Sequence, residues 1–255
     1  MARALTLPVD FAVTALLWLY YTVVFAAIWM PVYLLAAALA RDRRRAIQRC
    51  NHYYYRSFFA LLGWIAPGVR IEIAPELRAL RSAVVVCNHL SYLDPLLMMA
   101  AFERHTTIVK GSFFRVPVFG WVLRSAGYVP ALSADPLPNG MLKAIDGLAA
   151  HLTAGGVLFV FPEGTRSRDG ELGPFKAGAF RLARRFDAPI ELLRVQGTGR
   201  VFAPGQWLFR TCPRTRIRLD RIGRVEPGDH GPDGASLRAL VGRVEELYRH
   251  ADGLS

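Results

Sequence analysis

An uncharged run of thirty residues, 11–40, lies near the N-terminus of this 255-residue sequence. As one α-helix it would be about 45 Å long, and the hydrocarbon core of a bilayer is about 30 Å thick. The length and composition of the run therefore predict a membrane-embedded element. Pro31 is a natural position for a bend, which leaves two arrangements open: one spanning helix, tilted or kinked, or two shorter helices that lie in one leaflet.

Positive charges flank this run unequally. Arg3 precedes it, and four arginines follow within six residues, at positions 41, 43, 44 and 45. Because arginines accumulate on the cytoplasmic side of a membrane, we expect the rest of the chain to lie on the cytoplasmic face of the cell inner membrane. A signal peptide cleaved after Ala40 is a third interpretation, disfavoured by the length of the run and by the arginines that follow it.

The amino-acid composition limits the kinds of ligand and partner that the chain can be expected to bind. The chain is 53% hydrophobic and carries a formal charge of +12, which suits an anionic bilayer and anionic ligands. Nucleic acid is a weaker explanation, because the arginines are scattered and no nucleic-acid-binding motif is present. The three cysteines, Cys50, Cys87 and Cys212, are widely spaced and predict core thiols. The six histidines do not cluster with them, so no metal site is predicted.

Apolar runs alternate with helical patterns after residue 65. Strands are predicted at 69–73, 83–87, 106–109, 127–130, 157–161 and 190–195, and the charge alternation of 214–225 predicts a half-exposed edge strand. Helices are predicted at 46–65, 95–102, 116–125, 139–153, 176–186 and 234–250. This alternation indicates an α/β fold with a mixed, largely parallel sheet flanked by helices. We therefore divide the chain into an N-terminal membrane anchor with an amphipathic helix, 1–65, and an α/β domain, 66–255.

The string NHLSYLD, residues 88–94, leaves the end of one predicted strand and contains a histidine and a carboxylate five residues apart. A neutral imidazole can take a proton from an alcohol when a carboxylate bonded to its other nitrogen fixes the tautomer. His89 would be the base and Asp94 its orienting partner. A purely structural histidine at a strand end is the competing interpretation.

A second polar string, FPEGTRS at 161–167, leaves another predicted strand. Because ligands bind at the carboxyl ends of strands in open α/β sheets, both strings are expected to face one cleft. The carboxylate, hydroxyls and guanidinium of Glu163, Thr165, Arg166 and Ser167 suit a phosphate ester with neighbouring hydroxyls. A Pro-Gly turn with solvated charges is the simpler alternative.

Together, H-x-x-x-x-D and F-P-E-G-T-R-S resemble the first and third signature blocks of the glycerolipid acyltransferase family, over roughly residues 80–200. The resemblance implies transfer of an acyl group from an acyl-CoA or acyl carrier protein thioester to a lysolipid hydroxyl, with lysophosphatidic acid as the default acceptor. No cofactor is required. It also implies that His89 is the general base oriented by Asp94. The substrate-binding residues implied or suggested are Asn88, Lys110, Glu163, Gly164, Thr165, Arg166, Ser167 and Lys176.

The resemblance is incomplete in its second block. Lys110, Pro117, Gly120 and Gly127 fit that block, but the arginine that usually closes it is missing near Leu132 or Ser133. A lyso-aminolipid or glycolipid acceptor therefore stays open beside lysophosphatidic acid. A membrane-anchored lipid-binding protein without activity is the rival from another class.

No Gly-x-Ser-x-Gly elbow or cysteine nucleophile context is present in the sequence. Because a thioester is already activated, a base, a positioned hydroxyl and a few oxyanion donors are enough for direct transfer. Backbone N–H groups at the start of the helix expected after Asp94 are candidate oxyanion donors.

Overall fold

The computed structural model describes residues 2–131, 138–167, 169–230 and 234–253. A seven-stranded sheet forms its centre, with strand order β1-β7-β6-β2-β5-β3-β4. The strands are β1 Val69–Ile73, β2 Ala83–Cys87, β3 His105–Val109, β4 Val129–Pro130, β5 Val157–Val160, β6 Ile190–Gln196 and β7 Thr215–Val225. The sheet is parallel from β6 to β4, while β7 runs antiparallel to β6 and parallel to β1. The predicted mixed, largely parallel α/β sheet is confirmed.

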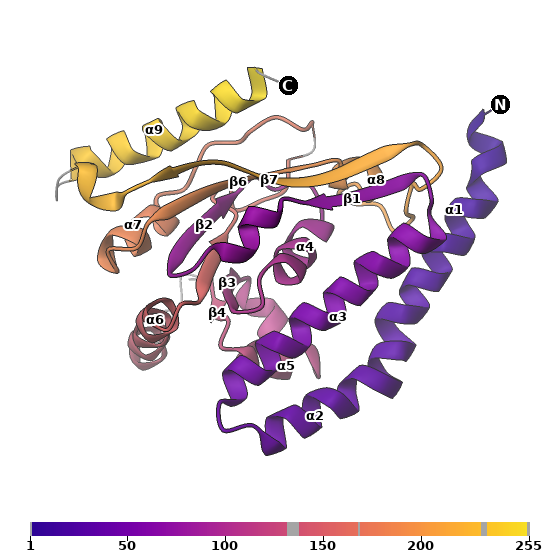
Figure 1. The fold of residues 1–255 in the computed structure, drawn as a ribbon, viewed down its shortest axis with the longest axis horizontal. Helices are drawn as coiled ribbons and strands as arrows, with labels where there is room; N and C mark the ends of the chain where they lie inside the picture. Colours follow the sequence, from indigo (N-terminus) through magenta and orange to yellow (C-terminus); the bar gives the residue numbers. More distant parts are fainter. Residues whose placement is uncertain (1, 132–137, 168, 231–233, 254–255) are drawn as a thin grey trace.

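Helices cover both faces of this sheet (Figure 1). The α-helices are α1 Ala2–Leu19, α2 Met30–Leu39, α3 Arg43–Ile65, α4 Leu93–Ala101, α5 Phe119–Ala126, α6 Pro138–Thr153, α7 Gly178–Arg185, α8 Thr198–Val201 and α9 Gly234–Gly253. A π-helix, η1 Tyr20–Trp29, joins α1 to α2, and short 3-10 helices are η2 Pro75–Ala79, η3 Gly111–Arg115 and η4 Pro227–His230.

The residues of strand β2 explain why helices cover both faces of the sheet and form three layers with it. All five of its residues are buried. Because alternate side chains of a strand point to opposite faces, Val85 and Cys87 pack with α3, α4 and α5, while Val84 and Val86 pack with α6, α7 and α9. The run AVVVC is therefore apolar throughout because both of its faces are covered.

Strand β7 is not an edge strand, and that prediction was wrong. It lies between β1 and β6 and pairs with both. Its charge alternation has a different origin: Ile217 and Leu219 are buried in the core, while Arg216 and Arg218 face outward and pair with Glu72. One solvent-facing side of an interior antiparallel strand produces the same sequence pattern as an exposed edge.

Helix α5 begins later than its apolar pattern suggested. The chain first forms η3, and then turns tightly at Val118, whose φ is 63° and ψ is −60°. Phe119 N–H donates to the Pro117 carbonyl across that turn at 2.6 Å. This local geometry keeps 116–118 outside the helix, which starts at Phe119.

The apolar N-terminal run is one bent helical stretch. Within Thr6–Leu39, the most apolar window of 18 residues has a mean hydropathy of 2.1 and only 6% of it is buried, so this segment is long and apolar enough to cross a membrane by length and composition. The stretch changes direction between α1 and α2 (Figure 1). Pro31 lies in the first turn of α2, directly after the π-helix, and brings no N–H to the helical hydrogen bonds there.

Polar contacts fasten the two ends of this stretch to the rest of the protein. The buried Asp10 carboxylate accepts hydrogen bonds from the Thr211 hydroxyl and from two backbone N–H groups, those of Thr211 and Cys212. At the other end, the Tyr33 hydroxyl donates to Asn51 at 2.6 Å. These contacts tie α1 to the segment before β7 and α2 to α3.

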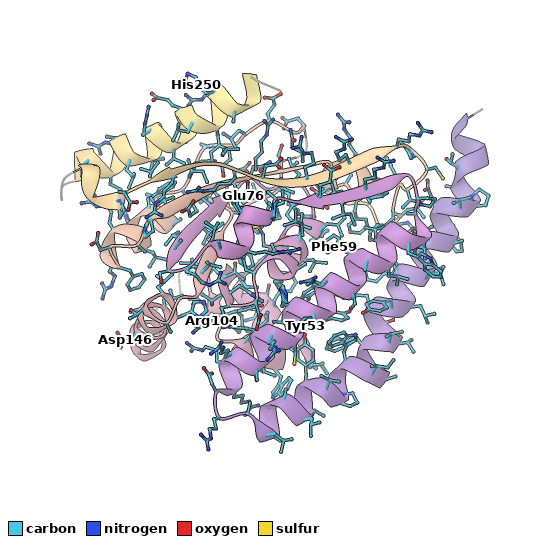
Figure 2. The ribbon with its side chains drawn as sticks, in the orientation of Figure 1. Tyr53, Phe59, Glu76, Arg104, Asp146 and His250 are labelled. Atoms are coloured by element: carbon cyan, nitrogen blue, oxygen red, sulfur yellow. The ribbon has the colours of Figure 1, made fainter. Side chains whose placement is uncertain are left out.

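The interior is continuous across the predicted boundary at residues 65 and 66. Phe59 of α3, labelled in Figure 2, is 4% exposed and belongs to the same core cluster as Val85 of β2 and Phe159 of β5. A polar chain crosses this core, because Asn51 donates to the Tyr128 hydroxyl and that hydroxyl also contacts Nε2 of His105. Helix α3 therefore acts as a layer of the α/β fold as well as a support for α1 and α2.

Two buried histidines should make the folded chain less stable at acidic pH. Burial lowers the pKa of His105 to about 3 and that of His151 to about 4, whereas both rings titrate near about 6.5 in an unfolded chain. Above about pH 6.5 both rings are neutral in the folded and in the unfolded chain, so the free energy of unfolding does not depend on them. Between about pH 6.5 and the folded-state pKa, only the unfolded chain binds these protons, and the free energy of unfolding falls by up to about 1.4 kcal/mol per pH unit for each ring. We expect the urea midpoint of unfolding to fall between pH 7 and pH 5.

The variant His151→Gln is the comparison for this experiment. It removes one of the two rings, so the midpoint should fall less steeply with decreasing pH than in the unmodified chain. Equal slopes in the two proteins would contradict the assignment of the effect to buried histidine.

Candidate active site

Three polar segments meet at one edge of the sheet. His89 follows β2, the loop that begins at Phe161 follows β5, and Lys110 follows β3. These strands are parallel neighbours in the order β2-β5-β3, so their carboxyl ends lie at the same edge. The two signature strings therefore lie together at one edge of the sheet, where Glu163 and Ser167 bond to the backbone of His89.

Asp94, in the first turn of α4, is hydrogen-bonded to the ring of His89. Its Oδ2 lies 2.9 Å from Nδ1 of His89 and accepts the backbone N–H groups of Leu90 at 2.6 Å and Ser91 at 2.7 Å. The carboxylate is 1% exposed and sits at a helix N-terminus, whose dipole favours a negative charge. Because a carboxylate oxygen only accepts hydrogen bonds, the imidazole nitrogen facing Oδ2 is assigned the N–H.

The other ring nitrogen of His89 is left available. Within the described ranges, no protein group bonds to its Nε2, and the side chain is 16% exposed. The ring stacks on Phe161 with centroids 4.2 Å apart and planes 20° from parallel. Phe161 was not singled out from the sequence, although it is the first letter of FPEGTRS.

Glu163 supports the backbone of His89. Its Oε1 accepts the His89 N–H at 2.8 Å and its Oε2 accepts the Gly173 N–H at 3.1 Å. In addition, the Ser167 N–H donates to the His89 carbonyl at 2.8 Å. Burial raises the pKa of Glu163, and these two N–H donors oppose that shift. The third block therefore holds both backbone groups of the candidate base, and Glu163 is placed to position His89 rather than to meet substrate directly.

Asn88 has a similar internal role. Its Nδ2 donates to the Val195 carbonyl at 3.0 Å, and its Oδ1 accepts the Val195 N–H at 2.8 Å. The side chain thereby continues the pairing of β2 with β6 by one step. Both ends of the amide are bonded to backbone, so the structure gives Asn88 a positioning task in place of the substrate contact expected from the sequence.

Arg166 stacks on Tyr92 and keeps one buried donor without a partner among the described residues. Its guanidinium carbon lies 3.4 Å from the centroid of the Tyr92 ring. Its Nη1 is buried and has no hydrogen-bond partner among the described residues. A buried guanidinium N–H without a partner is costly, so the site favours an anionic ligand there. Tyr92, which is 48% exposed, was not singled out from the sequence and has no motif signal beyond its position beside the histidine block.

The rest of the third block forms the outer rim. Gly164 and Thr165 are exposed, and Gly164 has a φ of 70°, which suits glycine. A Cβ at Gly164 would lie 2.5 Å from Nζ of Lys176, so that ammonium covers the loop. The Ser167 hydroxyl is engaged with Asp169 and with the Gly170 N–H. Lys176 thus lies beside Gly164 at the rim, where the sequence-based expectation that it binds substrate stays a prediction, while the Ser167 hydroxyl serves the turn.

Two further sequence expectations have different outcomes. Lys110, expected to bind substrate, is exposed at the end of β3, where its carbonyl accepts the Phe113 N–H. Leu132 and Ser133, near which the arginine of the second block is missing, lie outside the described residues. The first N–H groups of α4 are already used, because Leu93 donates to the Ser91 hydroxyl and Asp94 to the Ser91 carbonyl. They are not free oxyanion donors.

Cys87 is not equipped to be a nucleophile. It is fully buried, and burial raises the pKa of its thiol well above its ordinary value, which disfavours the reactive thiolate. The arrangement as a whole offers an oriented base, a free ring nitrogen and a cationic rim, which suits proton removal from a hydroxyl beside an anionic group.

Comparison with known proteins agrees with this geometry. Residues 68–191 match the sequence model of the family described as Acyltransferase. The chain is 36% identical over 122 residues to the chloroplastic 1-acyl-sn-glycerol-3-phosphate acyltransferase BAT2 of Brassica napus, covering 48% of this chain and 35% of that protein. It is 31% identical over 151 residues to 1-acyl-sn-glycerol-3-phosphate acyltransferase of Saccharomyces cerevisiae, covering 57% and 49%. The matched regions span about a third to a half of these relatives.

One solved structure resembles nearly the whole chain. The crystal structure of the 1-acyl-sn-glycerophosphate acyltransferase PlsC from Thermotoga maritima aligns with a TM-score of 0.71 at 22% identity. The alignment covers 96% of this chain and 97% of that one. The likeness at this identity concerns the fold, and its coverage extends the shared fold to the N-terminal helices.

Proposed function

Since residues 68–191 match the family model described as Acyltransferase, we propose that the chain belongs to this family and that it transfers a fatty acyl group from an acyl-CoA or acyl carrier protein thioester to the free hydroxyl of lysophosphatidic acid. The curated relatives carry the name of this activity. The hydrogen bond between Nδ1 of His89 and Oδ2 of Asp94, with Nε2 left free, is the observation that carries the proposal.

The reaction proceeds by direct attack. Nε2 of His89 takes the proton of the acceptor hydroxyl while that oxygen forms a bond to the thioester carbonyl carbon. The resulting tetrahedral oxyanion collapses, the carbon–sulfur bond breaks, and the leaving thiolate takes the proton back from Nε2. Asp94 stabilises the imidazolium that exists between these two steps. No acyl-enzyme forms, and the base ends each cycle in its starting state.

Arg166 binds the acceptor in this proposal. Its buried Nη1 has no partner in the described part of the chain, and a phosphate oxygen would supply one with a charge-assisted hydrogen bond. Lys176, exposed beside Gly164, adds a second positive charge at the rim. A phosphate between these groups compensates for the arginine that is missing from the second block.

A panel of acceptors tests this assignment. The purified full chain is incubated with radiolabelled acyl-CoA or acyl carrier protein and with lysophosphatidic acid, lysophosphatidylethanolamine, or a lyso-aminolipid without phosphate. We expect labelled phosphatidic acid as the main product. A preference for the phosphate-free acceptor would replace the acceptor but keep the reaction. No transfer to any acceptor, with the lipids still bound, would favour a lipid-binding protein without activity.

Tyr92 supplies a sharper test of the acceptor site. Its ring under Arg166 contributes a cation–π interaction of about 0.5–2 kcal/mol, so Tyr92→Leu should raise KM for lysophosphatidic acid about 2- to 30-fold. The KM for the acyl donor should stay unchanged. Tyr92→Phe keeps the ring face and should behave like the unmodified chain; equal effects of the two substitutions would contradict the stacking role.

The membrane arrangement that best fits the contacts is insertion into one leaflet at the cytoplasmic face of the inner membrane. Asp10 and Tyr33 both contact the folded part of the chain, although they are separated by about 34 Å of ideal helix. In a spanning helix one of these contacts would lie across the bilayer. The exposed arginines at 41–45 then lie at the headgroup level.

A further inference from the structure

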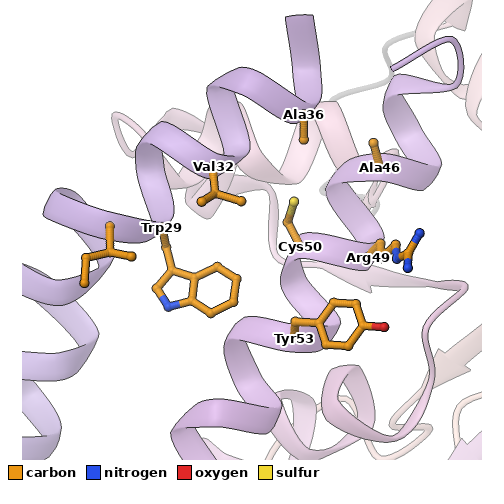
Figure 3. A pocket seen from close by; sticks show the side chains of 8 residues that line it. Trp29, Val32, Ala36, Ala46, Arg49, Cys50 and Tyr53 are labelled. Carbon is orange, nitrogen blue, oxygen red and sulfur yellow. The ribbon is translucent and has the colours of Figure 1, made fainter. Parts of the chain in front are cut away.

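A groove opens between the apolar helical stretch and the start of α3, outside the catalytic cleft. It has a volume of about 460 Å³, which is within the range of about 300–1,000 Å³ for ligand pockets. Trp29 and Val32 form one wall, Cys50 and Tyr53 form the other, and Arg49 stands at the edge (Figure 3). None of these residues takes part in the acyl-transfer site described above.

Small side chains create the hollow. Ala36 of α2 and Ala46 of α3 face each other where larger residues would close the gap between the helices (Figure 3). The neighbouring outward residues are apolar, since Ile28 is 60% exposed and Val32 is 43% exposed. The apolar part of this groove favours a hydrocarbon chain, because a polar group there would be desolvated without partners.

The edge of the groove is cationic. Arg49 pairs with Glu103 at 3.6 Å, but both side chains are well exposed, at 62% and 45%, and such a pair contributes little stability. Its guanidinium also lies 5.7 Å from the centre of the Tyr53 ring. The arginines at 41–45 begin the same helix or precede it. An anionic headgroup can therefore replace Glu103 without a large cost.

We propose that this groove between α2 and α3 binds one acyl chain of an anionic membrane phospholipid, whose phosphate lies against Arg49. The lipid would fill the space between the apolar stretch and α3. Its place is separate from His89, so it is a bound membrane lipid rather than the acceptor or the donor, and the proposal does not depend on the acyl-transfer activity.

Native mass spectrometry of the purified full chain tests the site. The protein is reconstituted in vesicles of equal parts phosphatidylglycerol and phosphatidylcholine and then extracted with mild detergent. We expect one retained phosphatidylglycerol per chain. Ala36→Phe and Ala46→Phe fill the groove from opposite sides, and each should lower the retained fraction at least about tenfold, a loss of about 1.4 kcal/mol in binding.

Two further variants separate the contacts. Leu34→Phe adds the same bulk to α2 at a residue that is 50% exposed and does not line the groove, so retention should be unchanged. Arg49→Gln should keep a bound lipid but lose the preference for phosphatidylglycerol. If both groove-filling variants fold, as judged by helix content, and retain lipid like the unmodified chain, the proposal is overturned. Absence of retained lipid on the unmodified chain has the same consequence.

Discussion

Replacing His89 by alanine is expected to lower the rate of acyl transfer by about 10²- to 10⁴-fold, the usual contribution of a positioned general base. The backbone of residue 89 should stay in place, because Glu163 and Ser167 bond to its N–H and carbonyl rather than to the ring. Thioester consumption with lysophosphatidic acid measures the loss, and the urea midpoint of unfolding measures the fold. We expect the second quantity to change little, since the ring is partly exposed.

The matched control is His250→Ala. His250 lies on the surface of α9, where its Nδ1 contacts only the Glu246 carbonyl among the described residues. Its loss should leave transfer unchanged. If the His89→Ala protein is folded and turns over at a rate within about threefold of the unmodified chain, the proposed base and the mechanism built on it are wrong.

The second large effect is expected at Asp94, where alanine and asparagine should differ. Oδ2 accepts hydrogen bonds from two backbone N–H groups and from the imidazole. An NH₂ group at this position would face three donors. The side chain of an asparagine would therefore place its oxygen there. His89 would stay oriented, but the negative charge that stabilises the imidazolium would be lost. A hydrogen bond to a charged group contributes about 1.5–3 kcal/mol, so Asp94→Asn should lower kcat about 10- to 150-fold.

Asp94→Ala removes the oxygen as well as the charge and should fall to the level of His89→Ala. Because the two groups act as a unit, the double variant His89→Ala, Asp94→Ala should be no slower than either single variant. Multiplicative losses in the double variant, or an Asp94→Ala protein as active as Asp94→Asn, would show that Asp94 does not act through the ring. The urea midpoints of unfolding, compared with the unmodified chain, separate these losses from a collapse of the loop that follows β2.

Much of the fold follows from local patterns. Strands β1 and β2 begin and end at the residues predicted, 69–73 and 83–87, because β1 alternates apolar and charged residues and β2 is a short apolar run, both local patterns. The pairing of β7 was predicted incorrectly, since charge alternation reports that one face meets water and says nothing about the neighbours on either side. Neighbours in a sheet are set by packing between segments far apart in the chain.

The same division holds for the active site. The spacing of His89 and Asp94 within five residues is local, and so their partnership could be predicted from the amino-acid pattern alone. The partners of Glu163 and Asn88 could not, because they lie 74 residues away at His89 and 107 residues away at Val195. A motif states that a carboxylate or an amide is needed, and only the folded chain decides whether its oxygens face substrate or backbone.

The sequence by itself therefore determined the apolar helical stretch, the α/β alternation and the imidazole–carboxylate pair, all of which depend on residues close together along the chain. The tertiary structure alone decided that Glu163 and Asn88 brace the base, that Tyr92 lies against Arg166, and that two alanines on separate helices leave a groove. These features arise where distant segments pack together, and a hydrogen bond or a cavity exists only once both sides are in place.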